Sequence, residues 1–198
     1  MNHINKLKDI GRDRSCLIIG GGHSVNDIDW SRIPDSMYII GINGHYSYMA
    51  DMIIYYDKDM QEYYRTRKLK PNQLLIGFKH RNSLDHTNDN CTHYYSYDDM
   101  VFGDSGFHAL QFADGIFNFK DIYLTGFDYS TEGNSYHYNE TESDPIKLDR
   151  FKKWSVGKVL AKYGDISWLH SVYNCNKKSK LEIFNFSLPY WQFKLINL

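Results

Sequence analysis

A short apolar run that stops at three consecutive glycines is the feature that most constrains the fold of this chain. Residues 16–19 predict a buried strand, and Gly20, Gly21 and Gly22 follow it directly before Ser24. Because glycine has no side chain, a phosphate or ribose can approach this backbone closely. Ser24 is suited to cap a following helix or to donate its hydroxyl to a ligand. The stretch therefore predicts either a phosphate-binding crevice or a tight strand-to-helix turn that binds nothing.

The size and charge of the chain narrow its class. Its 198 residues contain no internal repeat or linker-like segment, which predicts a single domain over residues 1–198. A formal net charge of -1 gives no global electrostatic basis for binding nucleic acid or an anionic membrane. We predict a cytoplasmic protein from three observations. The three cysteines are scattered, the N-terminus lacks the apolar core of a signal peptide, and no run approaches the ~20 apolar residues of a membrane helix.

Apolar, β-branched and aromatic runs alternate with helical segments along the whole chain. This pattern predicts an α/β fold, a single Rossmann-like domain whose mostly parallel sheet is covered by helices on both faces. The predicted strands are 15–19, 37–42, 52–56, 73–78, 93–97, 121–125 and 166–173, and the predicted helices follow Ser24 and span 58–67, 105–118 and 146–163. Ligands of such sheets bind where the strands end, near the topological switch point.

Small, polar or acidic residues follow four of the predicted strands. They are the glycine turn and Ser24 after the first strand, Asn43 after the second, Asp57 and Asp59 after the third, and Asp128 after the sixth. Each has a structural explanation on its own, as a turn residue, a helix cap or a loop acid. Their coincidence at one edge of the sheet predicts a binding site.

Two common nucleotide motifs are absent. A redox dinucleotide fold requires a third glycine and an acidic residue after the second strand, but Val25 and Asn43 stand at those positions. No Gly-Lys-Ser/Thr follows the glycines, which excludes a Walker phosphate loop.

Read in order, these segments resemble the bacterial sialyltransferases of glycosyltransferase family 42. The family has a glycine turn ending in Ser, an I-D-Y-S-R-L-P segment, a strand ending in Asn, T-S-G before a helix, and I-Y-L-S-G-I-D-F-Y. The matching segments here are Gly20–Ser24, Ile28–Pro34, Asn43, Asp104–Gly106 and Ile122–Tyr129, and the similarity continues to about residue 181. A related group of uncharacterised and pterin-pyrophosphokinase-like proteins shares the glycine turn and the G-x-D element.

The resemblance implies a GT-A-like variant of the Rossmann fold with a short lid, which uses a nucleotide-sugar donor. Gly20–Gly22 and Asn43 would approach the phosphate and sugar of the nucleotide. Ser105 and Gly106 would contact the donor at a helix N-terminus, where the helix dipole favours anions. Asp128 would order the rim of the site or bind ribose.

The resemblance also implies catalytic groups. Tyr129 and Tyr136 would donate hydrogen bonds to the departing nucleotide phosphate. The family's general-base histidine lies in a longer lid, so His137 is the local substitute for deprotonating an acceptor hydroxyl. The chain departs from the family at Gly21 and Asp57, where the family has Asn. The family chemistry implies no metal. The extra carboxylate at Asp57 would repel a phosphate unless a cation lay between them, so Asp57 and Asp59 are candidate ligands of Mg²⁺.

The sequence therefore predicts a glycosyltransferase with a CMP- or UDP-linked donor. The acceptor hydroxyl belongs to a glycan or to a modified, hydroxymethylated base of DNA, the latter expected in a phage. Two alternatives stay open, an Mg²⁺-dependent nucleotide phosphotransferase or pyrophosphokinase and a non-catalytic nucleotide-binding protein. A homo-oligomer is compatible with all three functions.

Overall fold

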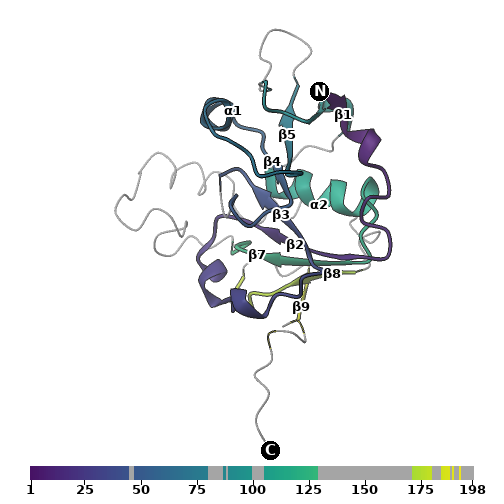
Figure 1. Ribbon diagram of the computed structural model, residues 1–198. Coiled ribbons are helices and arrows are strands. Elements are labelled where there is room, and N and C mark those ends of the chain that lie inside the picture. Colours follow the sequence, from purple (N-terminus) through teal and green to yellow (C-terminus); the bar gives the residue numbers. More distant parts are fainter. Residues whose placement is uncertain are drawn as a thin grey trace, which may run out of the picture.

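The computed structural model describes residues 1–44, 47–79, 87, 89–99, 105–128, 171–179, 184–187, 189 and 192 (Figure 1). Within these residues the chain builds a nine-stranded sheet in the order β1-β6-β5-β4-β3-β2-β7-β8-β9. Each neighbouring pair of strands is parallel. The carboxyl ends of the strands therefore meet at one edge of the sheet.

The elements occupy the following residues. The strands are β1 (Asn2–His3), β2 (Ser15–Ile19), β3 (Tyr38–Ile42), β4 (Met52–Ile54), β5 (Leu74–Phe78), β6 (His93–Tyr95), β7 (Asp121–Thr125), β8 (Val172–Asn174) and β9 (Asn185–Phe186). The α-helices are α1 (Lys58–Arg65) and α2 (Ser105–Gly115), and the 3-10 helices are η1 (Ile4–Leu7), η2 (His23–Asp27), η3 (Trp30–Arg32) and η4 (Tyr97–Asp99).

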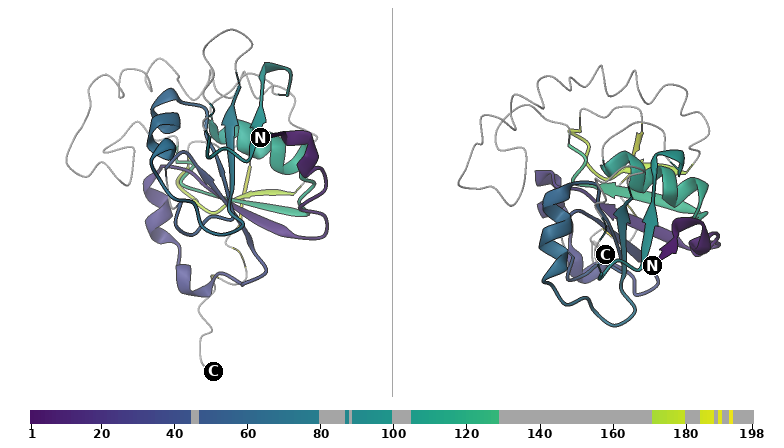
Figure 2. Two further views of the ribbon diagram at one scale, coloured as in Figure 1. Left: turned by 45° about the horizontal axis from the view of Figure 1, so that its top comes forward. Right: turned by 90° about the horizontal axis from the view of Figure 1, so that it is seen from above.

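Two apolar layers cover the sheet, because alternate strand residues point to opposite faces. One layer joins residues such as Ile18, Ile40 and Leu124 to the apolar side of α2. The other joins residues such as Leu17 and Ile53 to Tyr64 of α1 and to the segment that carries η2. Figure 2 shows the sheet between these helices. The central strands are buried on both faces, as near-continuous apolar runs in parallel sheets require.

The strand order changes direction at β2. From β2 the chain adds β3, β4, β5 and β6 on one side, and then returns through α2 to place β7 on the other side of β2. The last residues of the two strands, Ile19 and Thr125, are paired in the sheet. This pair marks the topological switch point, the place where open α/β sheets bind ligands.

The predicted α/β fold with a parallel sheet is confirmed, and so are the bounds of β2 and β7. The strands β3 to β6 lie within the predicted segments and are shorter by one or two residues. The helices α1 and α2 end at Arg65 and Gly115, before the predicted ends at 67 and 118. The strands β1 and β9 were not predicted. The strand β8 overlaps the predicted strand 166–173 at two residues. The predicted helix 146–163 and the start of the predicted strand 166–173 lie outside the described residues.

The prediction of a helix after Ser24 is wrong. The chain forms two short 3-10 helices there, η2 and η3, and Gly22 rather than Ser24 holds the N-cap position of η2. The reason is that the Ser24 side chain is engaged elsewhere, as described below.

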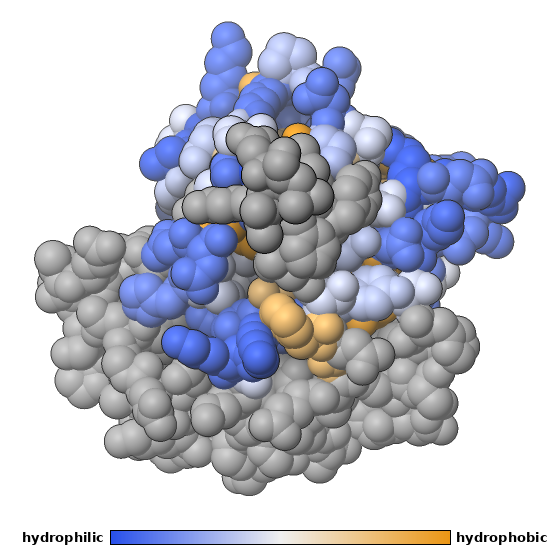
Figure 3. All heavy atoms as spheres, turned by 90° about the horizontal axis from the view of Figure 1, so that it is seen from below, coloured by the Kyte–Doolittle hydropathy of each residue, from blue (hydrophilic) through white to orange (hydrophobic). Residues whose placement is uncertain are grey.

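The described surface is consistent with contact with water. On the face shown in Figure 3, the described side chains are mainly hydrophilic, and a short hydrophobic strip is exposed among them. Across the described ranges, we find no helix with the length and apolar character that crossing a bilayer requires.

Candidate functional site

Two turns meet at the switch point, one after β2 and one after β7. The Gly20 N–H donates to the Thr125 carbonyl over 2.8 Å, and the Gly22 N–H donates to the Gly126 carbonyl over 2.9 Å. These bonds extend the pairing of β2 and β7 beyond the strands. The glycine turn and the segment Gly126–Asp128 therefore form one bonded unit.

The close approach of these two backbones requires glycine. A Cβ added at Gly20 would lie 2.6 Å from the Gly126 oxygen, and one added at Gly22 would lie 2.6 Å from the Asp128 Oδ2. Gly126 has a φ of 73° and would place its Cβ 2.5 Å from the Gly20 oxygen. The chain's own contacts thus account for glycine at 20, 22 and 126. Gly21, the third glycine of the turn, is partly exposed.

Ser24 and Asp128 lock the two turns together. The Asp128 carboxylate accepts hydrogen bonds from the Ser24 N–H at 2.9 Å, from the Ser24 hydroxyl, and from the Asn176 amide at 2.8 Å. The Ser24 Oγ in turn accepts from the Gly126 N–H at 3.0 Å. Ser179 adds a bond from its hydroxyl to the Phe127 carbonyl at 2.5 Å. Both oxygens of Asp128 therefore accept hydrogen bonds from the protein itself.

Asn43 lies at the carboxyl end of β3, the strand next to β2, in a left-handed turn with φ 58°. Its N–H donates to the Ile54 carbonyl at 2.9 Å, and its carbonyl accepts from the Tyr64 hydroxyl at 2.6 Å. These bonds fix the backbone. The side-chain Oδ1 is buried and has no hydrogen-bond partner among the described residues. A buried acceptor without a partner is costly, so this oxygen is a candidate ligand contact.

Asp57 and Asp59 lie at the start of α1, and both are exposed. The Asn43 amide donates to the Asp57 carboxylate over a long 3.5 Å, which places this carboxylate beside the end of β3. Asp57 takes the N-cap position without a side-chain capping bond. Within the described ranges, no three His, Cys, Asp or Glu side chains are grouped so that they could hold a metal ion.

Ser105 and Gly106 are the first residues of α2, and both are buried. Since α2 follows β6 and returns the chain to β7, its first turn lies at the carboxyl edge of the sheet. A helix of eleven residues presents free backbone N–H groups and a partial positive charge at this end. The predicted donor contacts therefore share an edge with Asn43 and the glycine turn.

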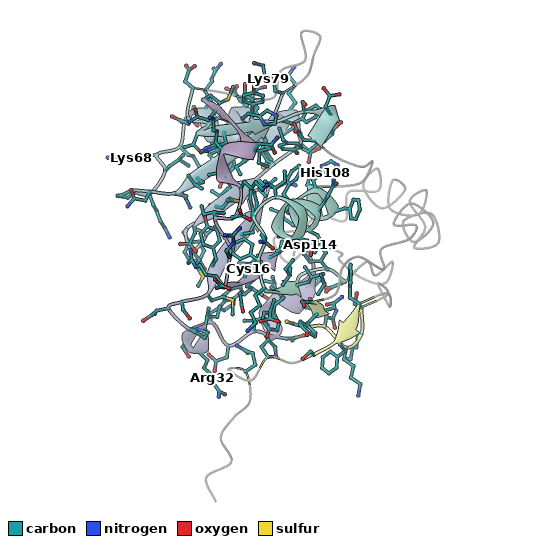
Figure 4. The ribbon with its side chains drawn as sticks, turned by 90° about the vertical axis from the view of Figure 1, so that its right-hand side faces the viewer. Cys16, Arg32, Lys68, Lys79, His108 and Asp114 are labelled. Atoms are coloured by element: carbon teal, nitrogen blue, oxygen red, sulfur yellow. The ribbon has the colours of Figure 1, made fainter. Side chains whose placement is uncertain are left out.

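The structure adds one candidate residue, His108, to those predicted from the sequence. His108, labelled on α2 in Figure 4, lies three positions after Ser105. Its exposed fraction is 1%. Its ring lies 5.6 Å from that of Tyr56 and 5.8 Å from that of Tyr95, both measured between ring centroids. Burial lowers the pKa of His108 to about 4. Neither ring nitrogen has a hydrogen-bond partner in the part of the chain that the structure describes. The i,i+3 spacing from Ser105 was the available signal.

The predicted catalytic residues Tyr129, Tyr136 and His137 lie outside the described residues, as does the predicted short lid. Their roles stay predictions. The structure brings Gly20, Gly22, Ser24 and Asp128 into contact, and it places Asn43 beside Asp57.

The sheet and its helices define a Rossmann-like α/β protein of the GT-A-like kind found in sialyltransferases. The fold is similar to that of the sialyltransferase CstII from Campylobacter jejuni, solved with cytidine-5'-monophosphate, with a TM-score of 0.58 and 19% identity over 93% of this chain and 88% of that one. CstII with the substrate analogue CMP-3FNeuAc gives a TM-score of 0.55 over 92% and 90% of the two chains, again at 19% identity.

The monofunctional α-2,3-sialyltransferase Cst-I from the same organism gives a TM-score of 0.53 at 16% identity, over 88% of this chain and 80% of that one. No family model and no curated protein matches the sequence. At these identities the likeness shows the fold alone.

Proposed function

We propose that this chain is a glycosyltransferase that moves a sugar from a CMP- or UDP-linked donor to an acceptor hydroxyl. One observation carries the proposal: the predicted donor-binding residues lie together at the carboxyl edge of a fold shared with sialyltransferases over about nine-tenths of the chain. Among those similar structures, CstII has been solved with CMP and with a trisaccharide acceptor.

The donor would bind across the switch point. The start of α2 at Ser105 and Gly106 suits the nucleotide phosphate, because the N–H groups and the dipole at a helix N-terminus attract anions. The unpartnered Oδ1 of Asn43 suits a donor group of the nucleotide, such as a hydroxyl or an exocyclic amine. Gly20, Gly22, Ser24 and Asp128 would shape this surface from behind rather than touch the ligand.

The reaction breaks the bond between the anomeric carbon and the phosphate oxygen and forms one from that carbon to the acceptor oxygen. His137 would take the acceptor proton as the nucleophile attacks. Tyr129 and Tyr136 would donate hydrogen bonds to the phosphate as negative charge develops on it. These roles rest on the family resemblance of the segment that follows Asp128.

A glycan is the acceptor that we favour over DNA. The net charge of -1 supplies no general attraction for a polyanion. A hydroxymethylated base in phage DNA is the alternative outcome, and the same transfer chemistry would serve it.

Asp57 gives the second candidate function its one supporting observation. A carboxylate 3.5 Å from the Asn43 amide would repel a nearby phosphate unless a cation lay between them. An Mg²⁺-dependent phosphotransferase would use Asp57 and Asp59 in that way. A nucleotide-binding protein without catalysis is the third candidate.

Calorimetric titration with CMP, UDP, ATP and GTP, each with and without Mg²⁺, separates the three. We expect CMP or UDP to bind without metal, and a CMP- or UDP-linked sugar to be turned over with a glycan acceptor. Strictly Mg²⁺-dependent ATP binding would instead support the phosphotransferase, and binding without turnover the non-catalytic protein. Lack of binding by all four nucleotides would exclude the enzyme proposals.

A further inference from the structure

We propose that His108 binds an uncharged, hydrogen-bonding group of the donor, in its base or its sugar. This inference rests on the proposed function, because it assigns His108 to the same donor site. His108 would be a specificity-determining residue, and it would act as a neutral imidazole rather than as a cation or a general base.

The position of His108 carries the first part of the argument. His108 is the fourth residue of α2 and lies three residues after Ser105, near the end of the helix that reaches the carboxyl edge of the sheet. The neighbouring rings come from the same edge, since Tyr56 follows β4 and Tyr95 ends β6. Asp57, the next residue after Tyr56, contacts Asn43. His108 is therefore linked through one strand end to the predicted donor contacts.

The unmet hydrogen bonds carry the second part. A neutral imidazole has one N–H donor and one acceptor nitrogen. His108 is 1% exposed, and within the described ranges both nitrogens lack partners. A phenylalanine would fill an aromatic cluster of Tyr56, Tyr95 and Phe112 without this cost. Both nitrogens of the His108 imidazole therefore fit a site in which a ligand supplies their hydrogen-bond partners.

The charge of His108 selects the ligand chemistry. Desolvation lowers its pKa to about 4, so the ring is uncharged at neutral pH. Around it, burial and the nearby Tyr56 and Asp57 raise the pKa of Tyr95 well above its usual value, so Tyr95 is uncharged as well. An uncharged imidazole gives a phosphate no ionic attraction. It matches the carbonyl, amine or hydroxyl groups of a base or sugar.

Entry of a ligand group requires local movement, because the His108 side chain is 1% exposed. Tyr56 is the partly exposed member of the cluster. We therefore expect the Tyr56 ring to move when the donor binds.

The test compares His108→Phe with His108→Gln, which keeps an amide donor and acceptor. The matched control is His93→Phe, a buried histidine at the opposite, amino end of β6. Calorimetry would measure the dissociation constants of cytidine, CMP and a non-hydrolysable CMP-linked sugar at pH 6.5 and 8. A long-range ¹H–¹⁵N spectrum would follow the His108 ring nitrogens during titration with CMP and with the analogue.

We expect His108→Phe to weaken binding of at least the CMP-linked sugar by about threefold to tenfold, equally at both pH values, while the thermal midpoint holds or rises. A weakening shared by cytidine would place the contact on the base, and one confined to the analogue would place it on the transferred sugar. His108→Gln should restore part of the affinity, and His93→Phe should leave it unchanged. The ring nitrogens should shift on binding.

The inference would be overturned if His108→Phe bound all three ligands with unchanged affinity and the wild-type His108 ring nitrogens showed no change in chemical shift on binding. An equal loss with CMP and with the CMP-linked sugar but none with cytidine would also overturn it, because it would place the contact on the phosphate. If wild-type protein binds neither these ligands nor uridine, UDP and a UDP-linked sugar, the proposed function fails first, which is a distinguishable result.

Discussion

Replacing Gly126 with alanine is expected to force apart the two turns at the switch point. The φ of 73° costs an L-residue about 1 kcal/mol, and the new Cβ would lie 2.5 Å from the Gly20 oxygen and 2.7 Å from its carbonyl carbon. Both neighbours are backbone atoms held between β2 and β7, so they cannot move as a flexible side chain would. Overpacking of this kind costs about 1–3 kcal/mol. Together we expect a loss of about 2–4 kcal/mol, or about 4–16 °C in Tm for a chain of this size.

The matched control is Gly115→Ala. Gly115 ends α2, has no atom within 4 Å of an added Cβ, and does not have a positive φ. This variant should keep or slightly raise the stability. Thermal and urea unfolding, followed by far-ultraviolet circular dichroism, would measure all three proteins. A Gly126→Ala midpoint within 2 °C of the wild type would refute the reasoning, because it would show that the two turns separate freely.

Three further predictions concern single side chains. Asn43→Gly keeps the left-handed backbone and removes the unpartnered Oδ1, so thermal unfolding should change little while calorimetry shows weaker CMP binding. In Asp128 the Ser24 N–H donates to Oδ2 and the Ser24 hydroxyl to Oδ1; Asp128→Asn replaces one of these oxygens with an NH₂ donor and should cost about 1–3 kcal/mol in urea unfolding. An unchanged midpoint would mean that the remaining amide oxygen satisfies both groups. The pKa of His108 is about 4 in the folded protein and about 6.5 in the unfolded chain, so the unfolded chain binds the extra proton first as the pH falls. We therefore expect this group to leave the free energy of unfolding unchanged above pH 6.5 and to lower it between pH 6.5 and 4, by up to roughly 3 kcal/mol. His108→Phe should flatten that part of the pH profile, and an equally steep profile in the variant would assign the acid sensitivity to other groups.

The fold was predictable because its signals are local. The strands β2 and β7 end directly before Gly20 and Gly126, so their bounds follow from the local sequence. Two-residue strands such as β1 and β9 carry no such signal, because only the pairing with a distant neighbour makes them strands. The predicted helix after Ser24 failed for a related reason. The partner of Ser24 is Asp128, 104 positions away, and this contact overrides the local capping preference.

The candidate site was predictable in its location and not in its internal roles. The structure places Asn43, Ser105 and Asp128 at the carboxyl edge of the sheet, as the pattern of strands and helices predicts; their binding of a ligand stays a prediction. The sequence did not show that the glycines at 20 and 22 serve the chain's own backbone. It also gave no sign that His108 is buried with neither ring nitrogen bonded to a described residue, since this burial depends on Tyr56, which follows β4, and on Tyr95 of β6.

The pairing of β2 with β7 has a consequence for the order in which the protein assembles. Ser15 and Asp121, bonded to each other in the finished sheet, are 106 positions apart. During synthesis the whole first half of the chain therefore emerges with one backbone edge of β2 open, although its residues 16–19 are apolar on both faces. Contacts of such high sequence separation form slowly, and an open apolar edge attracts other chains. We expect the nascent chain to need protection from aggregation until residue 125 has cleared the ribosome, and residues 1–120 expressed alone to aggregate.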